Sequence, residues 1–288
     1  MIYLIISILL NTLLFVIFKY FSFYKVNNLQ AIVVNYLVAA FVGYFSNQSF
    51  TDIISLPTRP WLPGTIFLGV LFITLFNVLA ITTQKGGLSV VSIASKMSVV
   101  IPVVFAFVVY KDHITLFKVI GIILALLAVY LVSKKTTSPS IEGKYLYLPV
   151  LLFLGSGILD TVLKYVETNY VKPEETNLYS ATIFLIAGIS GIIFMAIHWL
   201  ITKNRFELKS VIAGIVLGIP NFYSIFFLLK ALNIKGLESS YIFPVNNVGI
   251  VLLSAIVGVL LFNEKLTSSN KTGIVMAIFG IVFMSLRY

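Results

Sequence analysis

Cysteine is absent from this 288-residue chain, histidine occurs only twice, and only 10% of the residues are charged. The lack of cysteine excludes disulfides, thiol catalysis and thiolate metal sites. His198 has no second metal-ligand candidate at a useful spacing, so we expect no metal site and no other cofactor. Soluble domains carry roughly 25% charged residues, so the deficit of charge is typical of a membrane protein.

Apolar residues make up 59% of the chain and form long runs separated by short polar connections. Runs of this length cross a bilayer as helices, because a helix satisfies its own backbone polar groups. We therefore predict an all-α polytopic membrane protein with ten transmembrane helices and no soluble domain. The first run, Met1 to Phe18, lacks a basic leader and a cleavage site, so we expect a retained helix. The predicted spans are 2–20, 29–46, 62–83, 88–110, 116–133, 146–168, 177–201, 211–233, 237–262 and 270–287.

The net charge of +10 comes from basic residues that are spread over the short connections. Nucleic-acid-binding proteins gather such residues into a contiguous patch, so we do not expect nucleic acid as a partner. Lysine and arginine beside membrane spans act as topology signals and contact lipid headgroups. The charge therefore predicts membrane lipid as a partner.

The chain contains an internal repeat, with three pairs of similar segments in the same order. The pairs are Ser7–Thr12 with Ser156–Thr161, Gln84–Ser89 with Asn233–Ser239, and Lys111–Ser133 with Asn263–Ser285. We predict two five-helix repeats, over residues 1–137 and 138–288. An odd number of helices inserts the second repeat upside down, and inverted repeats of this kind are typical of secondary transporters that bind substrate near the midplane.

The segment Phe227–Thr267 and the Gly-rich terminal helices of both halves resemble the drug/metabolite transporter superfamily, in its EamA-type branch. The resemblance covers essentially the whole chain. It implies ten helices in inverted five-helix repeats, a central cavity, and export or exchange of small metabolites such as amino acids. It also implies that both termini are cytoplasmic, whereas the distribution of Lys and Arg over the predicted connections favours the opposite orientation.

Lys96 is a charged residue inside a predicted span. It shares a helix face with Ser92, about eight residues into the span, or roughly 12 Å at 1.5 Å per residue. A lysine can extend its ammonium group toward an interface, and this is one interpretation. The other is a cavity lysine that pairs with a carboxylate. Asp160 is the only acidic residue deep enough within a span to be that partner.

Ser156, Asp160, Lys164 and Glu167 form one polar stripe along another predicted span, which we expect to face the translocation path. In the alternative interpretation Asp160 and Lys164 only neutralise each other at i,i+4. Glu167 is close enough to the helix end that we expect it to reach water. Asp160 aligns with Asn11 in the repeat, so one half has a charge where the other has a neutral amide. This asymmetry predicts Asp160 as a substrate or proton-coupling residue and Asn11 as a substrate contact.

Further polar residues and prolines interrupt the remaining spans. We expect substrate contacts or, alternatively, bonds that only join helices from Asn77, Asn221, Tyr223, Asn246 and Asn247. Pro102 and Pro244 are candidate hinges or ordinary kinks. Two side-chain patterns have simpler interpretations. Trp61 and Trp199 lie near span ends and fit an interfacial aromatic belt, and Gly214 and Gly218 fit a small-xxx-small packing face.

We expect a secondary transporter that moves small polar metabolites, amino acids or similar zwitterions, by alternating access, as an exporter or proton-linked exchanger. Anionic metabolites, nucleotide-linked sugars and cationic drugs are alternative substrates. An intramembrane enzyme is the rival class, but no G-x-S-x-G elbow or HExxH motif is present, so we predict no enzyme. A membrane scaffold is a further alternative. We expect a monomer in the bacterial cytoplasmic (inner) membrane.

Overall fold

Every regular element in the described part of this computed structural model is a helix, as the all-α prediction requires. The structure describes residues 1–45, 54–76, 78, 95, 98–109, 115–133, 147–202, 207–234, 239–262 and 268–285. Three predicted site residues, Asn77, Ser92 and Lys96, lie outside the described residues.

The chain divides into two compact units, each built from two separate stretches of sequence. Unit 1 contains Met1–Thr74 and Val162–Asn233, and unit 2 contains Leu75–Thr161 and Ile234–Tyr288. The backbone passes from one unit to the other after Thr74, after Thr161 and after Asn233. Each unit therefore combines residues from both predicted repeats, and the repeat boundaries stay a prediction.

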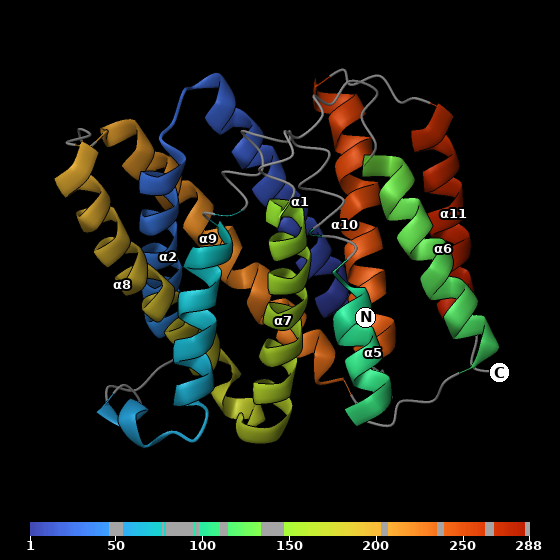
Figure 1. The fold of residues 1–288 in the computed structure, drawn as a ribbon, viewed down its shortest axis with the longest axis horizontal. Coiled ribbons are helices and arrows are strands. Elements are labelled where there is room, and N and C mark those ends of the chain that lie inside the picture. Colours follow the sequence, from blue (N-terminus) through green and yellow to red (C-terminus); the bar gives the residue numbers. More distant parts are fainter. Residues whose placement is uncertain are drawn as a thin grey trace. The chain divides into compact units, whose positions relative to one another are not determined.

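In unit 1, α2 (Asn28–Phe45) packs against both α8 (Thr176–Thr202) and α9 (Leu208–Leu232), and α1 (Ile2–Phe23) packs against α9 (Figure 1). Half of α2 is buried. The unit also contains most of the helix Leu62–Phe76, the end of α7 (Tyr147–Tyr170), and the 3-10 helices η1 (Leu56–Thr58) and η3 (Pro173–Glu175).

Two glycines on one face of α9 let its backbone approach α2 closely. Gly214 and Gly218 are four residues apart, so they lie on the same side of the helix, and both are buried. A Cβ built at Gly218 would lie 2.7 Å from Val38 Cβ and 2.9 Å from the Asn35 carbonyl oxygen, and one at Gly214 would collide with the Ala31 carbonyl oxygen. The predicted small-xxx-small face is confirmed as the α2–α9 contact.

Glu175 of η3 binds the segment that precedes the helix Leu62–Phe76. Its Oε1 lies 2.6 Å from Arg59 Nη1, and its Oε2 accepts a 2.8 Å hydrogen bond from Trp61 Nε1. The Trp61 indole is completely buried and meets the Tyr179 ring edge-on at 5.8 Å between centroids. The prediction that Trp61 belongs to the interfacial belt is therefore wrong, because the carboxylate holds it inside the unit. Trp199 is exposed, as a belt residue must be.

In unit 2, α6 (Leu116–Ser133) and α11 (Ser268–Ser285) pack extensively against each other. Small side chains at Ala125, Ala128 and Ala277 are buried in this unit, and Phe117 stacks on Phe283 at 6.0 Å. α10 (Ser239–Phe262) packs against α5 (Val100–Val109), α6 and α11 (Figure 1). The first part of α7, up to Thr161, also belongs to this unit.

The described helices have the length and surface of a membrane protein. Asn28–Phe45, Pro173–Ile197 and Leu208–Leu232 are long and apolar enough to cross a bilayer, and several shorter helices are also apolar. Large apolar side chains point outward, including Leu200, Leu208 and Leu260, each more than 70% exposed. Lipid covers such a surface without cost. At α6 the observed range equals the predicted 116–133, while the number of ten spans stays a prediction.

The helix predicted over 88–110 is not continuous. Ser98 and Val99 form a turn, and α5 begins at Val100. Pro102 is therefore in the first turn of α5, where its missing N–H removes no bond within the helix. Pro244 and Pro220 are inside α10 and α9, where each removes the donor for a carbonyl one turn earlier. Hinge roles for Pro102 and Pro244 stay predictions.

We expect Gly218→Leu to lower the unfolding temperature in detergent, because the new side chain would press on the α2 backbone. Overpacking typically costs about 1–3 kcal/mol, and backbone atoms cannot move aside as a side chain can. Val216→Leu is the control, since Val216 is on the exposed side of the same helix. Equal unfolding temperatures for the two variants, followed by intrinsic fluorescence, would contradict the close α2–α9 approach.

Candidate functional site

A chain of polar side chains joins α1, α2 and α9 inside unit 1. Asn11 Nδ2 donates to the carbonyl oxygen and the hydroxyl of Ser7, at 2.9 and 3.3 Å. Ser7 Oγ donates to the Ser224 carbonyl of α9 at 2.9 Å, and Ser224 Oγ donates to the Asn221 carbonyl at 2.8 Å. Asn221 Nδ2 then donates to Asn35 Oδ1 of α2 at 3.0 Å. The predicted site residues Asn11 and Asn221 thus belong to one network.

The amides of Asn221 and Asn35 join α9 to α2, whereas Asn11 bonds to Ser7 of its own helix. The three amides still have capacity to bind a solute. Each asparagine side chain offers two donors and an acceptor with two lone pairs, while Asn11 and Asn221 are only half-buried. A hydrogen bond between membrane helices contributes about 0.6 kcal/mol on average, so such bonds alone give modest stability. Asn35 and Ser7, both buried, were not predicted. Their only signal in the sequence is a polar residue inside an apolar run.

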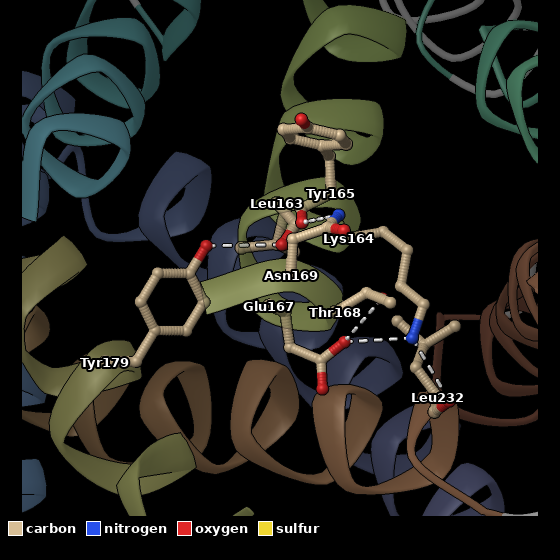
Figure 2. A network of polar contacts seen from close by, with 8 residues as sticks. All are labelled: Leu163, Lys164, Tyr165, Glu167, Thr168, Asn169, Tyr179 and Leu232. Carbon is tan, nitrogen blue, oxygen red and sulfur yellow. Dashed lines mark hydrogen bonds and ion pairs between the residues drawn. The ribbon is translucent and has the colours of Figure 1, made fainter. Parts of the chain in front are cut away.

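The most deeply buried charges in the described residues are Lys164 and Glu167 in the end of α7 (Figure 2). Lys164 Nζ lies 2.9 Å from Glu167 Oε2, and the Glu167 side chain is 1% exposed. Lys164 Nζ also donates to the Leu232 carbonyl at 3.2 Å. Leu232 is the last residue of α9, where carbonyl groups lack partners within the helix and the helix dipole is negative. The ammonium group therefore neutralises Glu167 and caps α9 at once.

This geometry corrects one expectation and identifies a partner of Lys164. Glu167 does not reach water, although it is near the end of its helix, because α7 continues to Tyr170 and the carboxylate turns toward Lys164. The carboxylate 2.9 Å from Lys164 Nζ is that of Glu167, at i,i+3, whereas the alternative interpretation considered Asp160, four residues before Lys164. Both positions share a helix face with Lys164, so spacing alone could not choose between them.

Further hydrogen bonds fix this end of α7 (Figure 2). Tyr179 Oη of α8 donates to the Leu163 carbonyl at 3.2 Å, and Thr168 Oγ1 donates to Glu167 Oε2 at 3.4 Å. Asn169 Nδ2 donates to the Tyr165 carbonyl at 2.8 Å. The end of α7 is thus bonded to α8 through Tyr179 and to α9 through Lys164.

The buried pair also lies beside two of the points where the chain changes units. The backbone enters unit 1 between Thr161 and Val162, just before Lys164, and leaves it between Asn233 and Ile234, just after Leu232. The Lys164–Leu232 bond consequently connects the stretch of unit 1 that follows the first crossing to the stretch that precedes the second. We call Lys164, Glu167 and the Leu232 carbonyl the crossing clasp.

The other predicted site residues are distributed over both units. Tyr223 is half-buried in an aromatic group of α9, with its ring centroid 6.0 Å from that of Phe227. Asp160, in α7, and Asn247, in α10, are half-buried in unit 2, where Asn246 is 5% exposed. Among the described residues, no three acidic or histidine side chains gather as metal ligands would.

We expect Lys164→Met to destabilise the protein by about 3–5 kcal/mol, because it leaves the Glu167 carboxylate buried without its counter-ion. The double variant Lys164→Met/Glu167→Met should recover most of that loss, since no charge is then left inside. Unfolding of the two single variants and the double variant in detergent gives the coupling energy.

Lys209→Met is the matched control, because the Lys209–Glu207 pair has a 3.3 Å separation but side chains that are 50% and 40% exposed. We expect this exposed pair to contribute less than about 1 kcal/mol. Additive losses from the two clasp variants would show that Lys164 and Glu167 do not depend on each other.

Comparisons with known proteins agree with this architecture. The sequence model of the EamA-like transporter family matches residues 1–134 and 144–286. A protein of Haemophilus influenzae, described as an uncharacterized protein, is 27% identical over 260 residues, which cover 88% of this chain and 86% of that protein. One crystal structure has the same fold, with a TM-score of 0.75 at 11% identity, covering 99% of this chain and 95% of that one. With nearly all of its residues matched, the chain belongs to the EamA-like transporter family.

Proposed function

We propose that this protein is a secondary transporter that moves small polar metabolites, amino acids or similar zwitterions, across the bacterial cytoplasmic membrane. The observation that carries the proposal is the family match over residues 1–134 and 144–286 of a chain built from apolar helices. Transport is the activity that the family name states. No enzyme motif in the sequence competes with it.

The polar side chains that lie between the helices support the proposal that the transported solute is polar. Asn11, Asn221 and Asn35 form a hydrogen-bonded network among apolar helices, and Asn246 is buried in unit 2. Polar groups within membrane spans are costly, and they mark substrate or ion pathways when they are present. Amide groups both donate and accept hydrogen bonds, so they suit solutes that do the same.

The charges support a zwitterion in particular. In the proposal Lys96 binds a carboxylate of the solute, with Ser92 on the same face, and Asp160 binds an ammonium group or a coupling proton. Asn11, Asn77, Asn221, Tyr223, Asn246 and Asn247 complete the polar lining. Anionic metabolites, nucleotide-linked sugars and cationic drugs are the other substrates to test, because spacing does not define the shape of a cavity.

The transport cycle in this proposal is alternating access, with Pro102 and Pro244 as hinge positions and either export or proton exchange as the direction. Inverted repeats of other transporters rock against each other in this way. We propose a monomer with both termini in the cytoplasm and with membrane lipid, the solute and protons as its partners.

We expect Lys96→Ala and Asp160→Asn each to reduce uptake of a labelled amino acid into proteoliposomes about ten- to hundredfold. A hydrogen bond to a charged group contributes about 1.5–3 kcal/mol, and each 1.4 kcal/mol is a factor of ten. The assay compares a panel of amino acids with a dicarboxylate and a cationic dye, at equal protein content per vesicle.

Lys209→Ala is the control for these variants, since Lys209 is an exposed residue at the start of α9. Unchanged uptake by both site variants, in a preparation whose wild-type protein is active, would refute the assignment of Lys96 and Asp160. Movement of the dicarboxylate or dye without any amino acid would change the substrate class and leave transport standing. A wild-type protein that moves no solute would contradict the proposed function.

If Asp160 carries a coupling proton, an imposed pH gradient should raise wild-type uptake severalfold and leave uptake by Asp160→Asn unchanged. The asparagine cannot take up or release a proton in this range, so it cannot couple the solute to the gradient. The measurement is the initial uptake rate with and without the gradient. An equal response of both proteins would exclude Asp160 as the coupling group.

A further inference from the structure

Asn246 has a buried polar atom that receives no hydrogen bond from the described part of the chain. The residue is 5% exposed, and its Oδ1 is buried without a hydrogen-bond partner. In a helix the residues one turn before and after share its face, and here these are Ile242 and Ile250, which are 0% and 2% exposed. The acceptor is therefore surrounded by apolar side chains along its own helix.

Such an atom is unusual and has a cost. More than nine in ten buried polar groups in native structures have a partner, and an unsatisfied one loses its hydration without gaining a bond. A Leu or Met in the same place would fill the space without that loss. Asn246 Oδ1 is thus a buried acceptor to which no described residue donates, and a donor group of another molecule would complete it.

In the predicted repeat, the position in the first half that is equivalent to Asn246 has a charged residue, Lys96. Lys96 follows Lys85 of the first Lys-Gly pair by 11 residues, and Asn246 follows Lys235 of the second Lys-Gly pair by 11 residues. Asp160 and Asn11 form the converse pair, with the charge in the second half and the amide in the first. Each half thus provides one charge, and the position equivalent to that charge in the other half is an asparagine.

From the buried acceptor and this position we propose that Asn246 Oδ1 binds a hydrogen-bond donor of the transported solute. The inference rests on the proposed function and narrows its substrate class. A neutral acceptor in apolar surroundings takes an N–H or O–H group, whereas a fully ionised carboxylate without donors would meet only repulsion from the same oxygen. The solute therefore has a donor group, as amino acids and amines do.

A stability comparison tests whether the acceptor is unmet in the empty protein. We expect Asn246→Leu to raise the unfolding temperature in detergent by about 2–4 °C, because the variant no longer buries an acceptor without a hydrogen bond. A small gain in the free energy of unfolding shifts the unfolding temperature of a chain of this length by about that much. Asn35→Leu is the matched control, because Asn35 is equally buried but accepts the 3.0 Å bond from Asn221, so its loss should lower the temperature. A fall for Asn246→Leu like that for Asn35→Leu would overturn the proposal.

Binding tests the donor itself, with glycine, sarcosine, N,N-dimethylglycine and glycine betaine as probes. All four are zwitterions, but the N–H donors decrease to none in betaine. We expect the thermal shift of the wild-type protein to decrease along this series, Asn246→Leu to bind glycine about tenfold more weakly, and Asn246→Asp to retain it. Equal binding of glycine and betaine, or loss of glycine in Asn246→Asp alone, would refute the acceptor role.

The stability comparison and the binding series distinguish a failure of the proposed function from a failure of the role of Asn246. A wild-type protein that binds none of the four zwitterions contradicts the amino-acid substrate of the proposed function, and the stability comparison then still decides whether Asn246 has an unmet acceptor. A protein that binds and transports glycine while Asn246→Leu does so equally well contradicts only the role of Asn246.

Discussion

The close approach of α9 to α2 is the contact on which the rest of unit 1 depends. Helices in lipid gain little from the hydrophobic effect when they pack, so backbone proximity and hydrogen bonds between helices hold them together. Gly214 and Gly218 leave room for the α2 carbonyl groups and bring Asn221 within 3.0 Å of Asn35. The same helix reaches α1 through Ser224 and α7 through the carbonyl of Leu232, so its position determines two further contacts.

Among the described residues of this unit, the two buried charges, Lys164 and Glu167, are each other's counter-ions. Lys164 and Glu167 neutralise each other while the lysine also caps α9, so one side chain meets the needs of a buried carboxylate and of a helix end. Such a pair contributes little net stability, because desolvation of both charges offsets their attraction. The pair fixes the position of the end of α7 against the end of α9, beside two of the three places where the chain passes between the units.

The buried amide of Asn246 in unit 2 differs from the amides that join helices in unit 1. The amides of Asn221 and Asn35 in unit 1 bind each other, whereas the buried oxygen of Asn246 has no partner among the described residues. The hydrogen bond between Asn221 and Asn35 stabilises the helix bundle, whereas Asn246 Oδ1 can still accept a hydrogen bond. A transporter needs both, because it must hold its helices together in lipid and still bind a solute that it later releases.

The sequence by itself determined the all-helical membrane architecture, most helix limits and the family, because hydropathy and the 3.6-residue period act within one helix. It also indicated the Gly214–Gly218 face and the polar positions Asn11 and Asn221. Only the tertiary structure decided that Lys164 pairs with Glu167, that Trp61 is buried against Glu175, and that α5 starts beside Pro102. Periodicity shows which residues share a face, whereas the partner of each face depends on which helix covers it and how closely the two backbones approach.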